Sequence, residues 1–406
     1  MERRDVAVTI QNMVQFYNMQ PGIDAMIEAG LSVDLYIPQI EGGWEEMYED
    51  TFSHVSSKEY RIYRLNQEIE YKILLEPYPM DTLFKFNTKY RIKYKYGALC
   101  AKPSTVYHAK DYLCYDGLLC NGPYEAGYLK TFAQPYIIGN MKYFNFCKQK
   151  EEHGKPVLLY LPTYGRFSSL KEVAAQIDFL KEKYYIIVKF HHGVLAEHEN
   201  IYKLDEKCDE WYDHKTELTA LLERADVVLS DNSGAIFEAI YAEVPVAIFA
   251  TEINENLAEF YTTQYDLVQK GVIPYTDNIE NIYDILEKAL SDEYRKKQKE
   301  IREEYFYIPE DQVKDFLDVI KSFMQDNINI RYKQLHDIFC RDYMGKKALA
   351  EKLPYIEQEM KNCLDELSKI RQEKEVCERK LSYYENGKLY RLMKKVYIIA
   401  FKVLRR

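Results

Sequence analysis

The chain has 406 residues, of which 47% are hydrophobic and 30% charged, and its formal net charge is −10. This length favours two domains with an appendage, because single hydrophobic cores stop growing well below it. The acidic balance excludes a nucleic-acid groove over most of the surface. Eight scattered cysteines without a C-x-x-C pair indicate reduced thiols, so we expect a cytoplasmic protein without a disulfide framework or metal site.

The first part of the chain begins with a βαβ pattern, which is typical of a doubly wound domain. Its predicted elements are a strand at 5–10, a helix at 23–28, and strands at 31–38, 112–120 and 135–138. The polar, Tyr-rich stretch between them gives no strand pattern. We place this domain at residues 1–147, and because its first strand follows the amino terminus directly, we expect no signal peptide.

A polar stretch at 148–155 separates a second α/β domain, which we place at residues 148–325. Its predicted elements are strands at 156–161, 184–190, 227–229 and 246–249, and helices at 169–183, 235–242 and 278–290. Two doubly wound domains that face each other form a cleft at the carboxyl ends of both sheets. Open α/β folds usually bind their ligands there.

The segment 225–249 reads as a buried strand, a turn, a helix and a second buried strand. A helix that opens with small residues leaves backbone N–H groups free to bind a phosphate. Ser233 adds a hydroxyl donor, and Gly234 allows close approach of the backbone. Glu238 lies one turn inside the helix, where its carboxylate can bind two ribose hydroxyls. This order predicts a nucleotide diphosphate; the alternative is an ordinary strand–turn–helix capped by Asp231 or Ser233.

Two other predicted strands of this domain end in polar residues at the same edge. Lys189 and His191 end one strand, where a cation or imidazole can offset the charge of a diphosphate as the nucleotide leaves. Adjacent strand residues point to opposite faces, so His192 is predicted to be structural. Thr163 and Arg166 follow the first strand and place a hydroxyl and a guanidinium near the same opening.

Residues 326–406 form a predicted helical extension, in which charged helix formers replace the strand patterns. An unbroken 4-3 spacing predicts a coiled-coil seam at Ile356, Met360, Cys363, Leu367, Ile370, Lys374, Cys377, Leu381 and Tyr384. A long helix packed on its own domain is the alternative.

The last segment, residues 388–406, carries seven basic residues and no acidic one. Its apolar residues fall on one helical stripe: Leu389, Leu392, Met393, Val396, Ile399, Ala400 and Val403. A basic amphipathic helix on an acidic protein indicates the surface of an anionic membrane, in preference to a partner helix.

The motifs "LPTYGR", "KFHHG", "ADVVLSDNSGAIFEA" and "VPVAIF" together resemble the carboxyl half of the CDP-glycerol glycerophosphotransferase family, the teichoic-acid and capsule polyol-phosphate transferases. The matching residues are Pro162, Thr163 and Arg166; Lys189 and His191; and Asp231 and Ser233. The chain departs from the family pattern at Gly165, at His192 and at Gly234.

This resemblance implies a GT-B-like fold of two facing Rossmann-like domains. It implies transfer of a polyol phosphate from a CDP-activated donor to a hydroxyl of a membrane-linked glycan or polymer, with no cofactor besides the donor. Together with the tail, it implies a peripheral enzyme on the inner face of the cell membrane, with oligomerisation through residues 356–384 as a further possibility.

The segment "YGALCAK" resembles the family's His-Gly-x-x-x-K block, with Tyr96 where the usual catalytic base is His. A free tyrosine titrates near 10, far from the working pH of such a base. A tuned Tyr96, a substitute such as His108 or Asp111, and another chemistry all stay open.

Three other functions are compatible with the sequence. A CDP- or UDP-dependent nucleotide-sugar glycosyltransferase shares the fold, and Glu238 as a ribose ligand fits it equally well. A UDP-sugar 2-epimerase ranks lower, because it needs several acidic residues in the first domain and has no use for a membrane helix. A non-catalytic scaffold that binds a nucleotide is the third.

Overall fold

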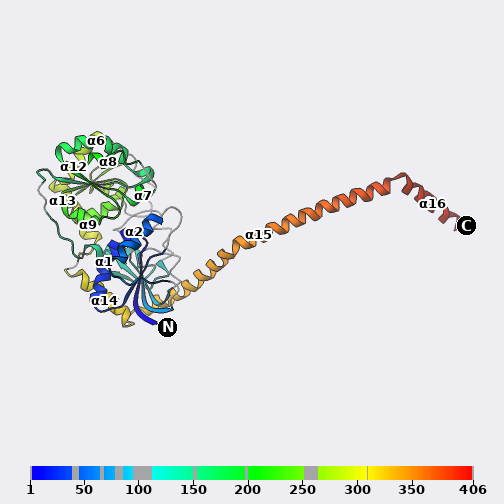
Figure 1. Cartoon of the computed structure of the whole chain (residues 1–406), viewed down its shortest axis with the longest axis horizontal. Helices are drawn as coiled ribbons and strands as arrows, with labels where there is room; N and C mark the ends of the chain where they lie inside the picture. The colour runs from blue at the N-terminus through cyan, green and yellow to red at the C-terminus, as the bar shows by residue number, and fades with distance from the viewer. Residues whose placement is uncertain are drawn as a thin grey trace. The chain divides into compact units, whose positions relative to one another are not determined.

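The computed structural model contains two compact units, residues Met1–Asp337 and Ile338–Arg406 (Figure 1). The structure describes residues 2–38, 45–64, 68–77, 86–94, 112–149, 153–196, 200–250, 264–308 and 310–404. The first unit holds two six-stranded sheets in which every described strand pair is parallel. The predicted α/β class is therefore confirmed.

The first sheet has the strand order β2-β1-β3-β4-β5-β6. Its strands are β1 (Glu2–Thr9), β2 (Val33–Tyr36), β3 (Ile69–Glu76), β4 (Asn87–Tyr94), β5 (Gly117–Cys120) and β6 (Pro135–Ile137). The connecting helices are α1 (Met13–Glu28), α2 (Glu45–Ser56) and α5 (Pro123–Leu129), and the short helix η2 (Met141–Tyr143) leads toward the second sheet.

The second sheet has the strand order β12-β11-β10-β7-β8-β9. Its strands are β7 (Val157–Leu161), β8 (Tyr185–Lys189), β9 (Glu210–Tyr212), β10 (Val227–Ser230), β11 (Val246–Phe249) and β12 (Tyr275–Thr276). Its helices are η3 (Gly165–Phe167), α6 (Leu170–Lys183), α7 (His192–Ala196), α8 (Leu204–Lys207), α9 (Leu218–Arg224), α10 (Ala235–Tyr241), α11 (Gln264–Gln269), η5 (Ile279–Asn281), α12 (Ile282–Leu290) and α13 (Asp292–Tyr305).

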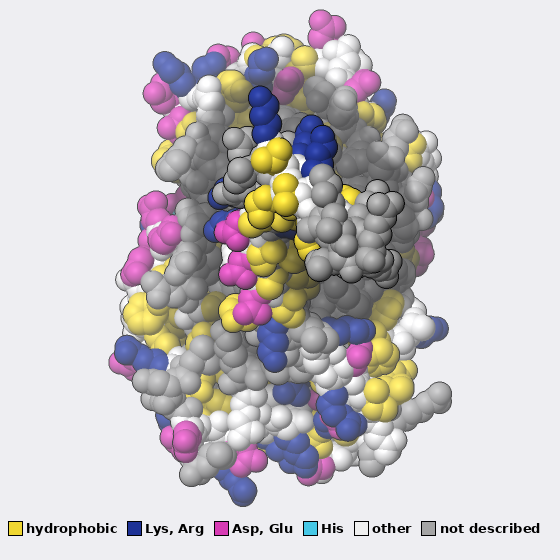
Figure 2. Space-filling view, turned by 90° about the vertical axis from the view of Figure 1, so that its right-hand side faces the viewer, with side chains coloured by type: hydrophobic (Ala, Val, Ile, Leu, Met, Phe, Trp, Pro, Cys, Tyr) yellow, Lys and Arg dark blue, Asp and Glu magenta, His cyan; other side chains and the backbone are white. Residues whose placement is uncertain are grey.

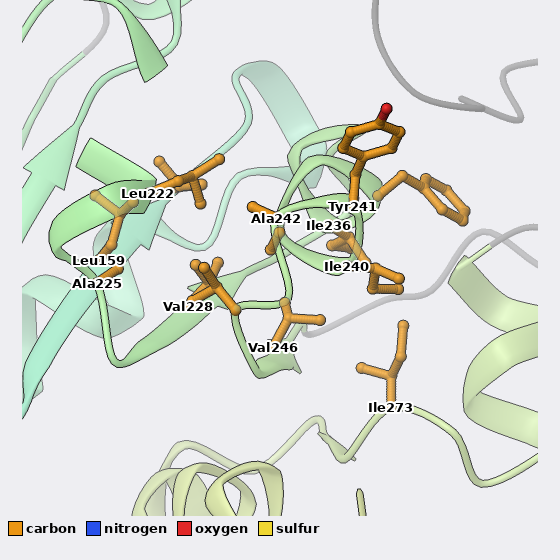
Figure 3. Packing of buried hydrophobic residues seen from close by; sticks show 14 of the residues in the cluster. Leu159, Leu222, Ala225, Val228, Ile236, Ile240, Tyr241, Ala242, Val246 and Ile273 are labelled. Atoms are coloured by element: carbon orange, nitrogen blue, oxygen red, sulfur yellow. The ribbon is translucent and has the colours of Figure 1, made fainter. Parts of the chain in front are cut away.

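The strands β7 and β11 of the second sheet are apolar along their whole length because helices cover both faces of the sheet. Every residue of β7 and of β11 is buried, as expected for parallel strands packed on two sides. Figure 3 shows one of these faces, where Leu159 and Val228 of the sheet lie with Ile236 and Ile240 of α10 in one hydrophobic cluster.

The helix α14 (Gln312–Met324) packs with the first sheet, although it follows the second one in the chain. Phe316, Ile320 and Phe323 are buried in the cluster that contains the apolar residues of β1 and β3. The predicted boundary at residue 325 assigned this helix to the second domain, so the packing differs from that prediction. Amphipathicity shows that a helix needs a partner surface, but not which one.

Two predictions for the first domain were incomplete. The helix predicted at 23–28 is α1, which begins ten residues earlier and carries Pro21 inside it. The strands β3 and β4 were not predicted, because charged residues interrupt their apolar pattern. Two of these charges, Lys72 and Lys89, pair with Asp326 just after α14, at 2.5 and 2.8 Å.

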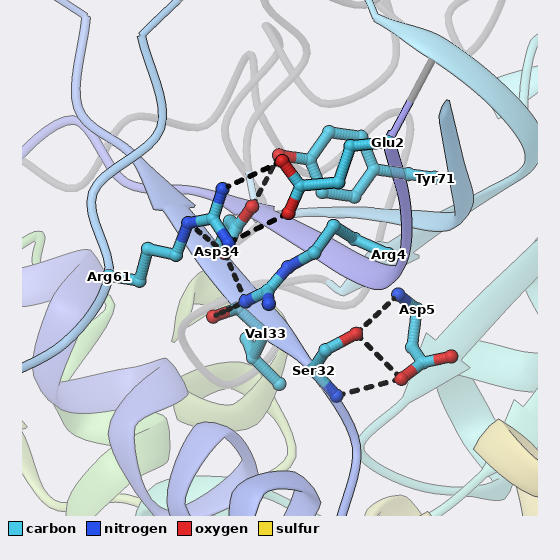
Figure 4. A network of polar contacts seen from close by, with 8 residues as sticks. All are labelled: Glu2, Arg4, Asp5, Ser32, Val33, Asp34, Arg61 and Tyr71. Atoms are coloured by element: carbon cyan, nitrogen blue, oxygen red, sulfur yellow. Dashed lines mark hydrogen bonds and ion pairs between the residues drawn. The ribbon is translucent and has the colours of Figure 1, made fainter. Parts of the chain in front are cut away.

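A buried carboxylate in the first sheet has charged partners on several sides (Figure 4). Asp34 of β2 is fully buried and accepts hydrogen bonds from Arg4 at 2.5 Å and from the Tyr71 hydroxyl at 2.6 Å. The Arg61 guanidinium lies 3.5 Å from the same carboxylate. Such a paired and hydrogen-bonded carboxylate is a structural group.

The long helix α15 (Ile330–Asn386) begins in the first unit and continues through the second, where α16 (Lys388–Leu404) follows. Many apolar side chains of α15 and α16 are exposed, among them Met360, Leu367, Ile370, Leu392 and Val396 at 60 to 62%. Figure 2 shows hydrophobic side chains at the surface beside charged ones. Among the described residues, no helix is both long and apolar enough to cross a membrane.

Candidate active site

The three motifs of the second domain follow three neighbouring strands. The sheet order places β7 between β10 and β8, and the parallel pairing aligns the carboxyl ends of all three strands. The loops that begin at Pro162, Phe190 and Asp231 therefore lie at one edge of the sheet. Carboxyl ends of parallel strands are the usual ligand position in this class of fold.

Asp231 ties the loop after β10 to the loop after β7. Its fully buried carboxylate accepts hydrogen bonds from the backbone N–H of Thr163 at 2.9 and 3.1 Å, and from the backbone N–H and hydroxyl of Ser169, both at 3.0 Å. Burial raises the pKa of Asp231 to about 7, although these hydrogen bonds favour the charged form. Asp231 thus positions the loop of Thr163, and both of its carboxylate oxygens accept hydrogen bonds from within the protein.

Tyr164 connects the loop after β7 to the loop after β8. Its ring stacks on the His191 imidazole, with centroids 4.7 Å apart and planes at 20°. Gly193 makes this contact possible, since a Cβ atom at that position would lie 2.6 Å from Tyr164 Cγ. Two motifs predicted only to share an edge are therefore in direct contact.

The orientation of His191 follows from its hydrogen bond. The backbone N–H of Gly193 donates to His191 Nδ1 at 3.0 Å, so in the neutral ring the proton resides on Nε2. The His192 ring, predicted to point to the opposite face, instead lies beside that of His191 with centroids 4.0 Å apart, because both residues follow β8 and do not belong to it. His191 can thus act as a hydrogen-bond donor in a fixed orientation.

Lys189, the last residue of β8, is half-buried and donates a hydrogen bond to the Asp213 carbonyl at 2.7 Å. Burial, with the repulsion of the nearby Lys142 ammonium, lowers the pKa of Lys189 to about 8. A cation in this state gains stability from an anionic ligand, because the ligand's charge favours the protonated form.

Ser233 and Gly234 directly precede α10, which begins at Ala235 as predicted. The backbone N–H of Ala235 donates to Ser233 Oγ at 3.2 Å, and the Gln264 amide donates to the Ser233 carbonyl at 3.0 Å. Gly234 is the capping residue of this seven-residue helix.

Glu238 forms a buried ion pair that the sequence did not predict. Its carboxylate lies 2.6 Å from Lys142 Nζ and accepts a hydrogen bond from the Tyr143 hydroxyl at 2.7 Å. Both partners belong to η2, which precedes the second sheet and carries no periodic pattern that marks it as functional. A ribose hydroxyl that bound Glu238 would therefore meet a carboxylate already fixed by an ammonium group.

The side chains of four candidate site residues are not located by the structure. The backbone of Arg166 lies in η3, but its side chain lies outside the described residues. Tyr96 and His108 also lie outside them, as does Asp111.

Comparison with known proteins gives a family match for the second domain. Residues 148–315 match the family model of CDP-glycerol:poly(glycerophosphate) glycerophosphotransferase. A search of curated protein sequences gives no significant match.

Solved structures give the fold. The wall teichoic acid polymerase TagF aligns with a TM-score of 0.54 at 13% sequence identity, over 80% of this chain and 89% of that one. The structure of the TagF variant H548A aligns with a TM-score of 0.55 at 13% sequence identity, again over 80% of this chain and 89% of that one. The calicheamicin glycosyltransferase CalG4 aligns with a TM-score of 0.47 at 9% identity, over 80% of this chain and 99% of that one.

The predicted GT-B-like fold is thus confirmed. Residues 148–315 match the predicted family, which supports a transferase.

Proposed function

We propose that the chain transfers a polyol phosphate, such as glycerol phosphate, from a CDP-activated donor to a hydroxyl of a lipid-linked glycan or polymer in teichoic acid or capsule synthesis. The observation that carries this proposal is the contact between the Tyr164 and His191 rings within the family-matched domain. That contact holds the His191 imidazole, two residues after Lys189, at the carboxyl edge of the sheet.

In the proposed reaction, the acceptor hydroxyl oxygen attacks the donor phosphorus that carries the polyol. The bond from that phosphorus to the bridging oxygen breaks, and CMP leaves. His191 donates its Nε2 proton in a hydrogen bond to the phosphate oxygens, and Lys189 offsets their charge. Positioned donors and cations of this kind supply most of the catalysis in phosphoryl transfer. The donor is a substrate, and no further cofactor takes part.

The enzyme acts, in this proposal, on the inner face of the cell membrane. The support is α16, whose exposed apolar residues accompany seven basic residues between 388 and 406. Each basic residue near an anionic surface contributes up to about 1 kcal/mol. The proposal includes pairing of two chains through the exposed seam of α15.

Release of CMP from CDP-glycerol by the full-length chain, with a lipid-linked glycerol phosphate oligomer as acceptor, tests the proposal. We expect His191→Ala to reduce turnover about 100-fold or more, since it removes a positioned donor. Thermal unfolding should change little, because His191 is not part of a hydrophobic core.

His153→Ala is the matched control. His153 is also a stacked histidine of this domain, with its ring 4.0 Å from that of Tyr185, but it precedes β7 at the opposite edge of the sheet. Near-normal turnover of His191→Ala would remove His191 from the mechanism. Nucleotide binding without CMP release or any other turnover would favour the scaffold, and turnover only with a nucleotide sugar would favour a glycosyltransferase.

A further inference from the structure

Three adjacent strands of the first sheet end in a row of buried polar residues. Glu76 of β3 pairs in register with Lys93 of β4. On the other side Val8 pairs with Leu75, so the next residues along, Thr9 and Glu76, lie side by side. Side chains in register on neighbouring parallel strands point to the same face of the sheet. The exposed fractions are 0% for Thr9, 0% for Glu76 and 4% for Lys93.

Two polar atoms of this row have no hydrogen-bond partner within the described part of the chain. Among the described residues, no donor or acceptor meets Thr9 Oγ1 or Glu76 Oε1. The other carboxylate oxygen of Glu76 accepts a hydrogen bond from the Tyr115 hydroxyl at 2.9 Å. Leaving a buried carboxylate oxygen unpaired costs free energy, so such groups tend to serve a ligand or a reaction.

The row is held in place by its surroundings. Lys93 Nζ lies 3.4 Å from the Pro77 carbonyl and 5.5 Å from the ring centroids of both Tyr112 and Tyr115. These contacts hold the Lys93 ammonium group in a buried position on the strand next to that of Glu76, whose carboxylate it influences electrostatically.

The same strand end is connected to the donor side. The hydroxyl of Tyr94, the residue after Lys93, donates to Asn140 Oδ1 at 2.9 Å. Two residues after Asn140, Lys142 pairs with Glu238 of α10 at 2.6 Å. The carboxyl end of β4 is thus linked to the candidate donor site, although through Tyr94, which points to the other face of the sheet from Lys93.

We propose that the row Thr9–Glu76–Lys93 is the acceptor end of the active site, and that Glu76 takes the proton from the acceptor hydroxyl. This inference rests on the proposed function. As the hydroxyl oxygen forms its bond to the donor phosphorus and CMP leaves, the hydroxyl proton passes to Glu76 Oε1. Thr9 orients the hydroxyl, and Lys93 binds the phosphate nearest the acceptor's end. The row thereby supplies a base, whose identity the sequence left open because Tyr96 replaces the family's histidine.

The electrostatics of Glu76 agree with this role. Burial raises the pKa of Glu76 to about 7, while the Tyr115 hydrogen bond and the charges of Lys93 and Arg91 act in the opposite direction. A general base works best when its pKa lies near the working pH. The rate should therefore rise with pH as Glu76 loses its proton.

The test measures kcat/KM of the full-length chain between about pH 5.5 and 8.5, with CDP-glycerol and a lipid-linked glycerol phosphate oligomer. Glu76→Gln should lower kcat by roughly 100- to 10,000-fold and remove the acidic limb of the profile. Its affinity for CDP-glycerol, measured by calorimetry, should stay at the wild-type value.

Tyr115→Phe provides a second readout that does not remove the base. Tyr115 is a positioning residue whose hydrogen bond favours the carboxylate, so its loss should move the acidic limb to higher pH. If Glu76→Gln does not fold, the position of the acidic limb in the pH profile of Tyr115→Phe tests whether Glu76 is the base.

Asp34→Asn is the matched control, because Asp34 is also a buried carboxylate of this sheet that accepts a hydrogen bond from a tyrosine. It should lower stability without moving the acidic limb. Wild-type kcat and an intact acidic limb in Glu76→Gln, or an unmoved limb in Tyr115→Phe, would overturn the assignment of Glu76 alone. No CMP release by the wild-type chain would overturn the proposed function and this inference with it.

Discussion

At the scale of single residues, the structure separates side chains that support the site from side chains that can face a ligand. Asp231 and His191 both belong to motifs that the sequence singled out. Asp231 is fully buried and accepts hydrogen bonds from the loop after β7, whereas His191 is partly exposed and held by Gly193 N–H and the Tyr164 ring. The motif pattern contains both roles without distinguishing them.

We expect nucleotide binding to draw a proton onto Lys189. With a pKa of about 8, roughly three-quarters of Lys189 is neutral at about pH 8.5. A diphosphate beside the amine favours its charged form and raises this pKa, so binding takes up protons. Calorimetry with CDP-glycerol in two buffers of different ionisation enthalpy measures the uptake.

Lys189→Arg should bind the nucleotide without this uptake, since arginine stays charged throughout. Equal apparent enthalpies in the two buffers for the wild-type chain would contradict contact between Lys189 and the phosphates.

At the scale of secondary-structure elements, different strands and helices carry the candidate site, the polar row and the basic segment. The strands β7, β8 and β10 position the donor motifs, while β1, β3 and β4 carry the polar row. The helix α16 has neither role and differs in composition, with seven basic residues in the segment 388–406. Its function can therefore be tested independently of the site.

Deletion of residues 385–406 should abolish binding to vesicles that contain anionic lipid and leave CDP-glycerol binding intact. Binding of the full chain should weaken with salt, because surface attraction is screened over about 8 Å at physiological ionic strength. Vesicle flotation with and without anionic lipid measures both effects.

The apolar stripe of α16 should matter as well as its charge. Val396→Asp, on the stripe, should weaken vesicle binding by more than about tenfold, since it replaces a membrane-buried side chain by a charge. Tyr397→Asp makes the same change of charge beside the stripe and should have a smaller effect. Equal binding to neutral and anionic vesicles would contradict the electrostatic part, and absence of binding to both would remove the membrane assignment.

At the scale of the whole molecule, the chain crosses between its two sheets more than once. After α13 it returns to the first sheet, where Tyr307 N–H donates to the Asn121 carbonyl at 2.9 Å. A Cβ atom at Gly122 would lie 2.1 Å from the Tyr305 carbonyl oxygen, so the two backbones touch. The return explains why α14 completes the core of the first domain.

Assembly of two chains is the prediction at this scale. The apolar side chains of the seam are 46 to 61% exposed in Ile356, Met360, Leu367, Ile370 and Leu381. A helix that is stable in water normally buries such an apolar seam against a partner helix. Cys363 and Cys377 lie two heptads apart on this seam and are exposed. In a parallel, in-register pair each cysteine faces its own copy, so mild oxidation should link two chains covalently.

Light scattering should give the mass of two chains, and the double variant Cys363→Ser, Cys377→Ser should keep that mass but lose the cross-link. Cys147, exposed outside the seam, remains in this variant and controls for random collisions. A monomer at micromolar concentration would refute pairing, and an uncrosslinked dimer would refute the parallel arrangement.

The sequence by itself determined the features that depend on local pattern. Continuous apolar runs gave the central strands of the second domain, because parallel strands buried on both faces must be apolar throughout. Motifs that follow such strands directly predicted a site at the carboxyl edge of the second sheet, because parallel strands all end on the same side. The family resemblance followed from the same motifs.

The tertiary structure alone decided which groups meet across the chain. Lys142 of η2 pairs with Glu238 of α10, a contact that no sequence motif indicated. Glu76 lies between Thr9 and Lys93 only because the strand order is β1-β3-β4. The strands β3 and β4 were not predicted because they contain charged residues, and the residues that pair with these charges lie elsewhere in the chain. Strand order and burial are set by the packing of distant segments, which local periodicity does not encode.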